Sequence, residues 1–501
     1  MRNSLLVLAA ALVSGCMMGP DYQRPTLEVP QSYRGQLGAA EAASLADQPW
    51  WEVFHDPVLQ RLVRQALENN LDLRQAIARV EQAQAQVKVV YSPIFPQLGY
   101  GAAAARQSGP IVTQGSIDSV TYNSSVASVG LSWELDIWGK VRRATEAAQA
   151  EMLATEDFQR GVMITLLSGV AASYFQLLAL DRELEIARET VALYGKTVGL
   201  FRDKYEGGAS SLLPVNRAAA QLANTAANIP ELERRIADTE NRLSILLGRA
   251  PGPIPRGEKL TEQKGPPAIP PGLPSQLLER RPDVRQSEEQ LVAENARIGV
   301  AKANFFPSLS LTGLFGGQST HVNSVLNGSS TIWSFGAGLV GPIFTGGRLT
   351  GEYEAQESRW KQAKANYEQT VLNALGEVSN ALVGQQKLTE IRTQRDLAVQ
   401  ELQSSVELSL DRYLVGAASY FEVLQAQEQF YFSQQALVQT QVDQLITIVQ
   451  LYRALGGGWQ QQAATGTPDP GSAPAKPMGE GTEPDPPIVA GTETRATPIP
   501  E

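Results

Sequence analysis

An internal repeat is the feature that most constrains how this chain can fold. Asp203-Lys204-Tyr205 recurs as Asp411-Arg412-Tyr413, at an offset of 411 − 203 = 208 residues. Upstream, Asp72-x-Arg74-Gln75 recurs as Asp283-x-Arg285-Gln286, where the offset is 283 − 72 = 211. Self-similarity at a fixed spacing predicts a fold built from two copies of one unit. The change of three residues in the offset is expected to fall in an exposed loop, where insertions are tolerated.

The segments outside the two copies differ from them in composition. Residues 251–274 are dense in Pro and Gly, which is typical of a linker. The last part of the chain has little that could form a core and is expected to be disordered. We therefore predict a signal peptide at 1–15, a lipidated segment at 16–54, repeats at 55–250 and 275–459, a linker at 251–274 and a tail at 460–501.

Each repeat is predicted to run helix, strand, loop, strand, long helix, tight turn, helix. The long helix of the first repeat covers about residues 139–205, and at about 1.5 Å per residue it would reach about 100 Å. Such a helix needs neighbours along its whole length, as in a bundle, a coiled coil or a helical tube.

The shorter helix after each tight turn indicates which of these packings applies. In the first repeat, apolar residues follow heptad spacing from Val215 to Leu246. In the second repeat two stripes share one helix, one beginning at Phe421 and the other at Val423. A plain antiparallel coiled coil accounts for one stripe, whereas a wall in which each helix has two neighbours accounts for both.

Four short segments alternate apolar residues with small or polar ones. They lie at about residues 97–106, 122–135, 308–317 and 331–344, and each is close to the length of a tilted membrane strand. A soluble sandwich gives the same alternation. Four strands cannot close a barrel around a lumen, however, and open edges are not tolerated in lipid, so a membrane sheet of this size needs other subunits. The connecting residues 107–121 and 318–331 are predicted to be outward loops, and Trp133 and Trp333 are candidates for an interfacial belt.

The N-terminus has the pattern of an export signal. Arg2 precedes a short apolar run at residues 5–13, which is too short to span a membrane. The run ends in Val13-Ser14-Gly15-Cys16, which resembles the lipobox of bacterial lipoproteins, and Cys16 is the only cysteine. An ordinary signal peptide with a chance cysteine is the alternative. A multiply acylated Cys16 would hold the chain on a membrane without a transmembrane helix.

Composition disfavours several other functions. The net charge is −10 and the pI is about 5.1, whereas nucleic acids favour clustered Lys and Arg. The two histidines, His55 and His321, have no His or Cys nearby to suggest a metal site. No catalytic signature occurs in a suitable context, so we do not expect an enzyme.

Four motifs together resemble a known family. The chain is similar to the outer-membrane factors, the TolC/OprM-type, NodT-like efflux lipoproteins, over about residues 20–459. The motifs are Gly19-Pro20-Asp21-Tyr22-Gln23-Arg24-Pro25, Trp133-Glu134-Leu135-Asp136-x-Trp138-Gly139, Arg280-Arg281-Pro282-Asp283 and Ala454-Leu455-Gly456-Gly457-Gly458-Trp459.

The resemblance implies a mainly α, α+β chain that assembles as a homotrimer. It would form a twelve-stranded outer-membrane β-barrel, four strands per chain, continued by a long periplasmic α-helical barrel. The function implied is a passive exit duct for drugs or other small molecules, with no cofactor beyond lipid on Cys16. The implied partners are a periplasmic adaptor and an inner-membrane transporter of the resistance-nodulation-division type, without nucleic acid. The alternative is a non-conducting periplasmic coiled-coil scaffold lipoprotein.

The same resemblance suggests two functional sites. The family's periplasmic constriction would fall on Glu422 and Gln425, where three copies of Glu422 could form a carboxylate ring that favours cations. Ser419-x-x-Glu422 is also a capping box at a helix start, and both interpretations stay open. The adaptor would meet the helix-turn-helix tips at Gly207, Gly208, Ala209, Ser210, Gly416, Ala417, Ala418 and Ser419.

Overall fold

A computed structural model describes residues 17–36, 55–113, 116–263 and 271–457, without the side chains of 111–118. The predicted signal peptide, Cys16 and the predicted tail at 460–501 lie outside these residues. The described residues belong to one compact unit, Met1–Trp459.

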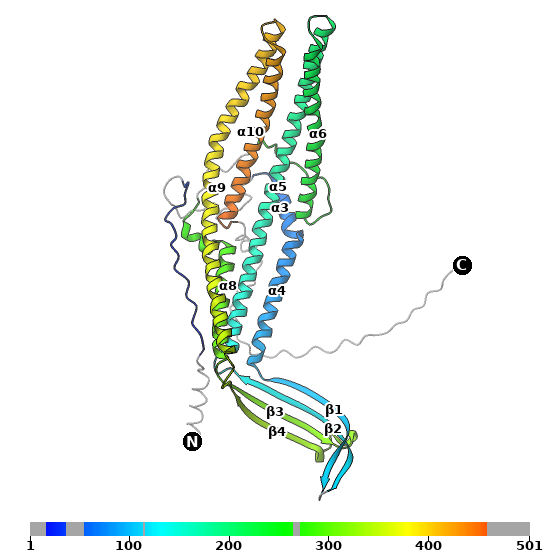
Figure 1. The fold of residues 1–501 in the computed structure, drawn as a ribbon, viewed down its shortest axis with the longest axis vertical. Coiled ribbons are helices and arrows are strands. Elements are labelled where there is room, and N and C mark those ends of the chain that lie inside the picture. Colours follow the sequence, from blue (N-terminus) through cyan, green and yellow to red (C-terminus); the bar gives the residue numbers. More distant parts are fainter. Residues whose placement is uncertain (1–16, 37–54, 114–115, 264–270, 458–501) are drawn as a thin grey trace, which may run out of the picture. The chain divides into compact units, whose positions relative to one another are not determined.

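The two repeats fold into the same series of elements (Figure 1). The first contains α3 (Pro57–Asn69), α4 (Leu71–Tyr91), β1 (Gln97–Thr113), β2 (Ser116–Leu135), α5 (Lys140–Glu206) and α6 (Leu212–Leu246). The second contains α7 (Leu277–Arg280), α8 (Pro282–Ala303), β3 (Ser308–Ser319), β4 (Thr331–Val340), α9 (Arg348–Leu414) and α10 (Tyr420–Ala454). The long helices α5 and α9 each have 67 residues.

Two pairs of short helices stack end to end. Asn70 caps α4 by accepting a hydrogen bond from the Leu73 amide, and its own amide group donates to the last carbonyl of α6, at Leu246 (3.0 Å). In the second repeat Arg281 occupies the equivalent position, 281 − 70 = 211, and donates to the Ala454 carbonyl of α10 (3.0 Å). Each short pair therefore acts as one composite helix beside a long helix, with α6 above α4 and α10 above α8 in Figure 1.

The helices form a layer in which each has defined neighbours. Near the sheet the order is α4, α5, α8, α9, and near the tips it is α6, α5, α10, α9. Helix α10 thus packs against both α5 and α9, as its two stripes predict. Buried members of the stripe that begins at Val423 include Val423, Ala426 and Thr440, and those of the other stripe include Leu424, Tyr431, Val438, Val442 and Leu445.

Helix α5 combines great length with an apolar sequence. Among the described helices, it is the one that is long and apolar enough to cross a membrane by length and composition. Most of its apolar window is nevertheless buried within the protein, where Tyr174 and Phe175 are fully enclosed. Helix α5 is therefore a core helix around which the others pack.

The four strands form one antiparallel sheet in the order β1-β2-β3-β4. Tyr100 pairs with Val129, Val129 with Phe315, and Phe315 with Trp333, so one row of large apolar side chains crosses the sheet. Residues directly opposite in antiparallel strands share a face. The predicted apolar alternation thus falls on one face of the sheet.

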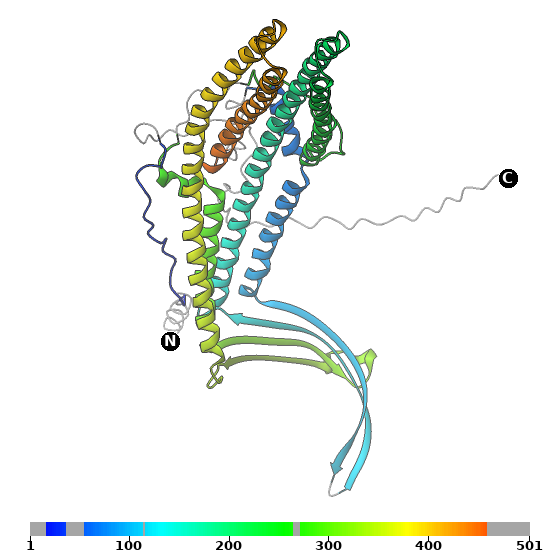
Figure 2. The same ribbon diagram turned by 45° about the horizontal axis from the view of Figure 1, so that its top comes forward.

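The prediction that residues 107–121 form a loop is wrong. Gln107 pairs with Tyr122 and Thr113 with Ser116, so β1 and β2 continue as a hairpin past the end of β3 (Figure 2). Polar cross-strand bonds support this part, including one from the Tyr122 hydroxyl to Gln107 (2.9 Å). Residues 107–121 lack the apolar alternation used to predict strands, because they lie beyond the row of large apolar side chains that crosses the sheet.

The strand predicted at 331–344 instead ends at Val340, shortly before Pro342, which has no N–H for a ladder.

The joint between α4 and α6 depends on Gly248. Its φ is +66°, and a Cβ there would lie 2.2 Å from the Asn69 carbonyl oxygen. We predict that Gly248→Ala lowers the free energy of unfolding by about 2–4 kcal/mol, combining left-handed strain with overpacking. Gly208→Ala is the matched control: its φ is +71° but the space around it is open, so only about 1–2 kcal/mol of strain is expected. Urea unfolding followed by circular dichroism measures both, and equal losses would contradict the packing explanation.

Candidate functional site

Among the described residues, the two outer edges of the sheet have no hydrogen-bonded partner strand. Strands β1 and β4 are each hydrogen-bonded on one side only, and their apolar side chains are strongly exposed. Tyr100 on β1 is 94% exposed and Trp333 on β4 is 75% exposed. A sheet with an apolar, exposed face and two open edges is incomplete in both water and lipid.

The junction between sheet and helices is fixed by two tryptophans. Trp133, a candidate for the interfacial belt, is half-buried and donates to the Ile94 carbonyl (2.9 Å). Trp138 donates to the Pro307 carbonyl (2.8 Å) and stacks on Phe306. Asp136 accepts hydrogen bonds from the Val141 and Arg142 amides in the first turn of α5. The strand end and the start of α5 are therefore held together.

The segment that follows Cys16 is bound to the helix layer. The Met18 amide donates to the Trp138 carbonyl, and Arg143 donates to the Met18 carbonyl (3.0 Å) and to Asp21 (2.7 Å). Further along, Arg24 makes a two-pronged contact with Glu288 on α8 (2.5 and 2.6 Å). Sequence reasoning did not assign these contacts, although Asp21, Tyr22 and Arg24 belong to one of the family-like motifs.

Arg281, from another of these motifs, lies at the joint between α8 and α10. It is buried and binds Asp283 (2.6 Å) and Glu377 on α9 (2.8 Å). Burial opposes ionisation of Asp283, but the hydrogen bonds and charge of Arg281 outweigh it and lower the pKa of this carboxyl. The joint is thus an ionised network that ties the composite helix to α9.

The two tips have the same backbone geometry. In the first, the Gly208 and Ala209 amides donate to the Tyr205 and Lys204 carbonyls, and in the second, Gly416 and Ala417 donate to Tyr413 and Arg412. Gly208 and Gly416 both have positive φ, of +71° and +80°. Of the residues predicted to meet an adaptor, Gly207, Gly208, Ala209, Gly416, Ala417 and Ser419 are exposed, and Ser210 and Ala418 are partly buried.

Contacts within the chain hold the tips side by side. The Lys204 ammonium lies 4.1 Å from the centroid of the Tyr413 ring, and Phe201 packs edge-on against the same ring. Below them, the Gln427 amide donates to Thr197 in a buried contact between α10 and α5 (2.9 Å). The end of each long helix is therefore coupled to the other helical hairpin.

The predicted constriction residues lie at the start of α10. Ser419 and Glu422 form a capping box: the Glu422 carboxylate accepts from the Ser419 amide (3.1 Å), and the Ser419 hydroxyl accepts from the Glu422 amide (3.4 Å). Glu422 and Gln425 are both exposed in the single chain. Glu422 therefore caps the start of α10, and its carboxylate remains exposed.

Among the described residues, no group of three or more His, Cys, Asp or Glu is arranged to hold a metal ion. His55 and His321 are both exposed and lie in separate parts of the chain.

The family model described as outer membrane efflux protein matches residues 62–249 and 273–457. These two matched segments coincide with the two repeats. The chain belongs to the outer membrane efflux protein family. This confirms the family resemblance and the expectation of an outer-membrane efflux channel.

Named relatives of this efflux protein are similar over almost its whole length. The Cation efflux system protein CusC of Escherichia coli O6:H1 is 35% identical over 461 residues, covering 91% of this chain and 99% of the relative. The "Probable outer membrane lipoprotein SilC" of Salmonella typhimurium is 34% identical, covering 89% and 97%. The open-state structure of the Neisseria gonorrhoeae MtrE outer membrane channel aligns with a TM-score of 0.79 and 28% identity, covering 89% and 99%.

The capping box of this efflux protein can be tested against its repeat counterpart. Ser211 is the N-cap of α6, at 419 − 211 = 208, but its side chain makes no capping hydrogen bond. We predict that Ser419→Ala lowers the stability of the first turn of α10 by about 1 kcal/mol, whereas Ser211→Ala changes α6 by much less. Amide hydrogen exchange at the two tips measures this difference, and equal effects would argue against a working capping box.

Proposed function

We propose that the protein is the trimeric outer-membrane duct of a tripartite efflux system. Three chains join edge to edge, so that β4 of one pairs with β1 of the next and the twelve strands close into a barrel. The helix layers join in the same way into a tube that continues below the barrel. The observation that carries this proposal is the sheet with one continuous apolar face and two unpaired edges.

The duct is held in the outer membrane by its barrel and by lipid on Cys16. The contacts of Met18 and Asp21 support this, since they hold the first described residues beside the junction of sheet and helices. A lipid at that position would sit beside the barrel wall, and the name of SilC as an outer membrane lipoprotein also supports the anchor.

The partners are a periplasmic adaptor and an inner-membrane transporter of the resistance-nodulation-division type. The adaptor would bind the exposed turns around Gly208 and Gly416, whose matching geometry gives a trimer six similar docking positions. The transporter supplies the energy, and the duct itself carries out no chemistry. CusC is named as part of a cation efflux system, which supports an assembly of this kind.

The channel proposal is tested by measuring mass and ion conductance of the purified protein. Trimeric mass and discrete conductance steps in planar bilayers are expected. A non-conducting scaffold lipoprotein would give stable protein without steps, and a monomer with a closed soluble sheet would overturn the proposal.

Two adjacent residues on β4 can test which face of the sheet contacts lipid and which faces the lumen. Phe335 lies in the apolar face and the adjacent Ser334 points the other way. We predict that Phe335→Arg costs up to roughly 2–4 kcal/mol in the bilayer and strongly reduces assembled trimer in the outer membrane. Ser334→Arg should assemble normally and shift ion selectivity toward anions. Trimer yield on gels and reversal potentials measure the two effects, and equal assembly of both variants would count against a membrane barrel.

The start of α10 lines the periplasmic constriction, where three copies of Glu422 form a carboxylate ring. Glutamine also serves in a capping box, so Glu422→Gln removes the charge while keeping the cap. We predict weaker cation preference in Glu422→Gln channels, whereas Ser419→Ala channels, which keep the charge, should retain it. Reversal potentials in a salt gradient measure the preference. Unchanged selectivity in Glu422→Gln would leave Glu422 as a cap alone.

A further inference from the structure

The helix layer has one covered face. The Tyr174 hydroxyl on α5 donates to Asp56 (2.7 Å) and accepts from the Gly257 amide, so the segment before α3 and the linker lie on this face. On α8, Glu288 receives Arg24 of the N-terminal segment. Since that segment begins beside the lipidated Cys16, the covered face is the outside of the proposed tube.

Helical spacing identifies the residues that lie on the opposite face of the helix layer. Thr165 is nine residues, or about two and a half turns, before Tyr174, so the two point in opposite directions from α5. Gln286 and Gln290 are each two residues from Glu288 and likewise point away from the covered face of α8. In the proposed trimer this face lines the lumen.

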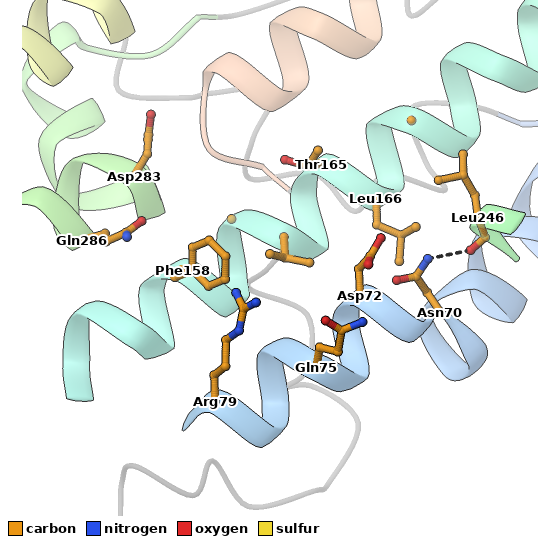
Figure 3. Close-up of a pocket in the computed structure, with 13 residues that line it drawn as sticks. Asn70, Asp72, Gln75, Arg79, Phe158, Thr165, Leu166, Leu246, Asp283 and Gln286 are labelled. Atoms are coloured by element: carbon orange, nitrogen blue, oxygen red, sulfur yellow. Dashed lines mark hydrogen bonds between the residues drawn. The ribbon is translucent and has the colours of Figure 1, made fainter. Parts of the chain in front are cut away.

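A hollow of about 630 Å³ opens on this lumen face between α4 and α8, with α5 as its floor. It continues into a second hollow of about 510 Å³ that shares Arg79, Phe158 and Gln286. Figure 3 shows Asp72, Gln75 and Arg79 on one side, Phe158 and Thr165 on α5, and Asp283 and Gln286 across from them.

Glycines on α5 keep the floor of the hollow open. A Cβ on Gly161 would meet nothing within 4 Å, and Gly169 faces only Leu246 at 3.8 Å. With the offset of 208, the equivalent positions on α9 are 161 + 208 = 369 and 169 + 208 = 377, which are Gln369 and Glu377. Glu377 pairs with Arg281 at the second joint, whereas Gly169 leaves the first joint open.

The rim of the hollow carries opposite charges over an apolar floor. Asp72 makes no ion pair or hydrogen bond among the residues the structure describes, while Asp283 is neutralised by Arg281. Arg79 lies 5.5 Å from the centroid of the Phe158 ring, and Val162 and Leu166 complete the floor. Asp72 and Arg79 are seven residues apart on one face of α4, which is about 10 Å along the helix.

From this geometry we infer that the hollow is a lumenal binding site for aromatic zwitterions. The ammonium of the ligand pairs with Asp72, its carboxylate pairs with Arg79, and its ring lies on Phe158 and Leu166. The inference rests on the proposed function in taking this face as the lumen. Binding must be weak, because a transit site has to release what it takes up.

The test uses norfloxacin, a fluorescent zwitterion with a piperazine ammonium and an aryl carboxylate. Its fluorescence anisotropy is titrated with the full-length protein in detergent, and saturable binding is expected. Asp72→Asn should weaken binding of norfloxacin and of its cationic ethyl ester roughly fivefold to tenfold, without changing binding of the anionic nalidixic acid. Arg79→Gln should weaken norfloxacin and nalidixic acid and spare the ester. Equal losses for all three compounds, or none, would overturn the site.

Filling the hollow supplies a second test that does not depend on charge. Gly161→Leu should fold, since the space is open and leucine favours helix over glycine, and it should abolish saturable binding. Gln369→Leu, the repeat equivalent on α9, should leave binding unchanged. Retained binding in Gly161→Leu would overturn the inference. Loss of the trimer in place of a loss of binding would also overturn it, because it would mean that a neighbouring chain fills the hollow. Mass and conductance of the same preparations report separately on the proposed channel.

Discussion

The structure depends on where the backbone hydrogen bonds at the sheet margins are made. Neighbouring strands of the four-stranded sheet satisfy each other's backbone hydrogen bonds, but in the described part of the chain the backbone groups at the outer edges of β1 and β4 are unpaired. In lipid an unpaired backbone group costs several kcal/mol, and a row of them along two edges cannot be sustained. Closure by sister chains removes both edges at once. Closure around a ring also produces a lumen, so the channel follows from satisfying the backbone.

The two repeats solve the same packing problem with different chemistry. Each places a composite helix beside a 67-residue helix and joins its halves through the residue at the start of α4 or α8. In the first repeat a neutral amide, Asn70, makes the joint beside Gly169. In the second, Arg281 makes it and is fixed by Glu377. The buried Arg281 guanidinium contacts Asp283, Glu377 and the Ala454 carbonyl, so more contacts set the geometry of the second joint than of the first.

The motifs that mark the family also have local physical roles. Asp136 holds the first amides of α5, and Trp138 holds the strand that follows α8. Arg24, in the N-terminal segment, binds Glu288 on α8, and Arg143 on α5 binds Met18 and Asp21 of the same segment. These residues join parts of the chain that carry no periodic pattern of their own. Such contacts fix the positions of the sheet, the helices and the N-terminal segment relative to one another.

The sequence by itself determined the local structures whose signal lies within one segment. Heptad stripes predicted the helix pairs, alternation predicted the apolar face of the sheet, tight turns were predicted around Gly208 and Gly416, and Ser419 with Glu422 predicted the capping box. Tertiary structure alone decided the stacking of α4 on α6, the extended hairpin after Arg106, the Arg24–Glu288 contact and the hollow beside Phe158. The hairpin was missed because its residues carry no apolar alternation. The other features depend on residues far apart in the chain, 264 positions in the case of Arg24 and Glu288, and no local pattern encodes such a meeting.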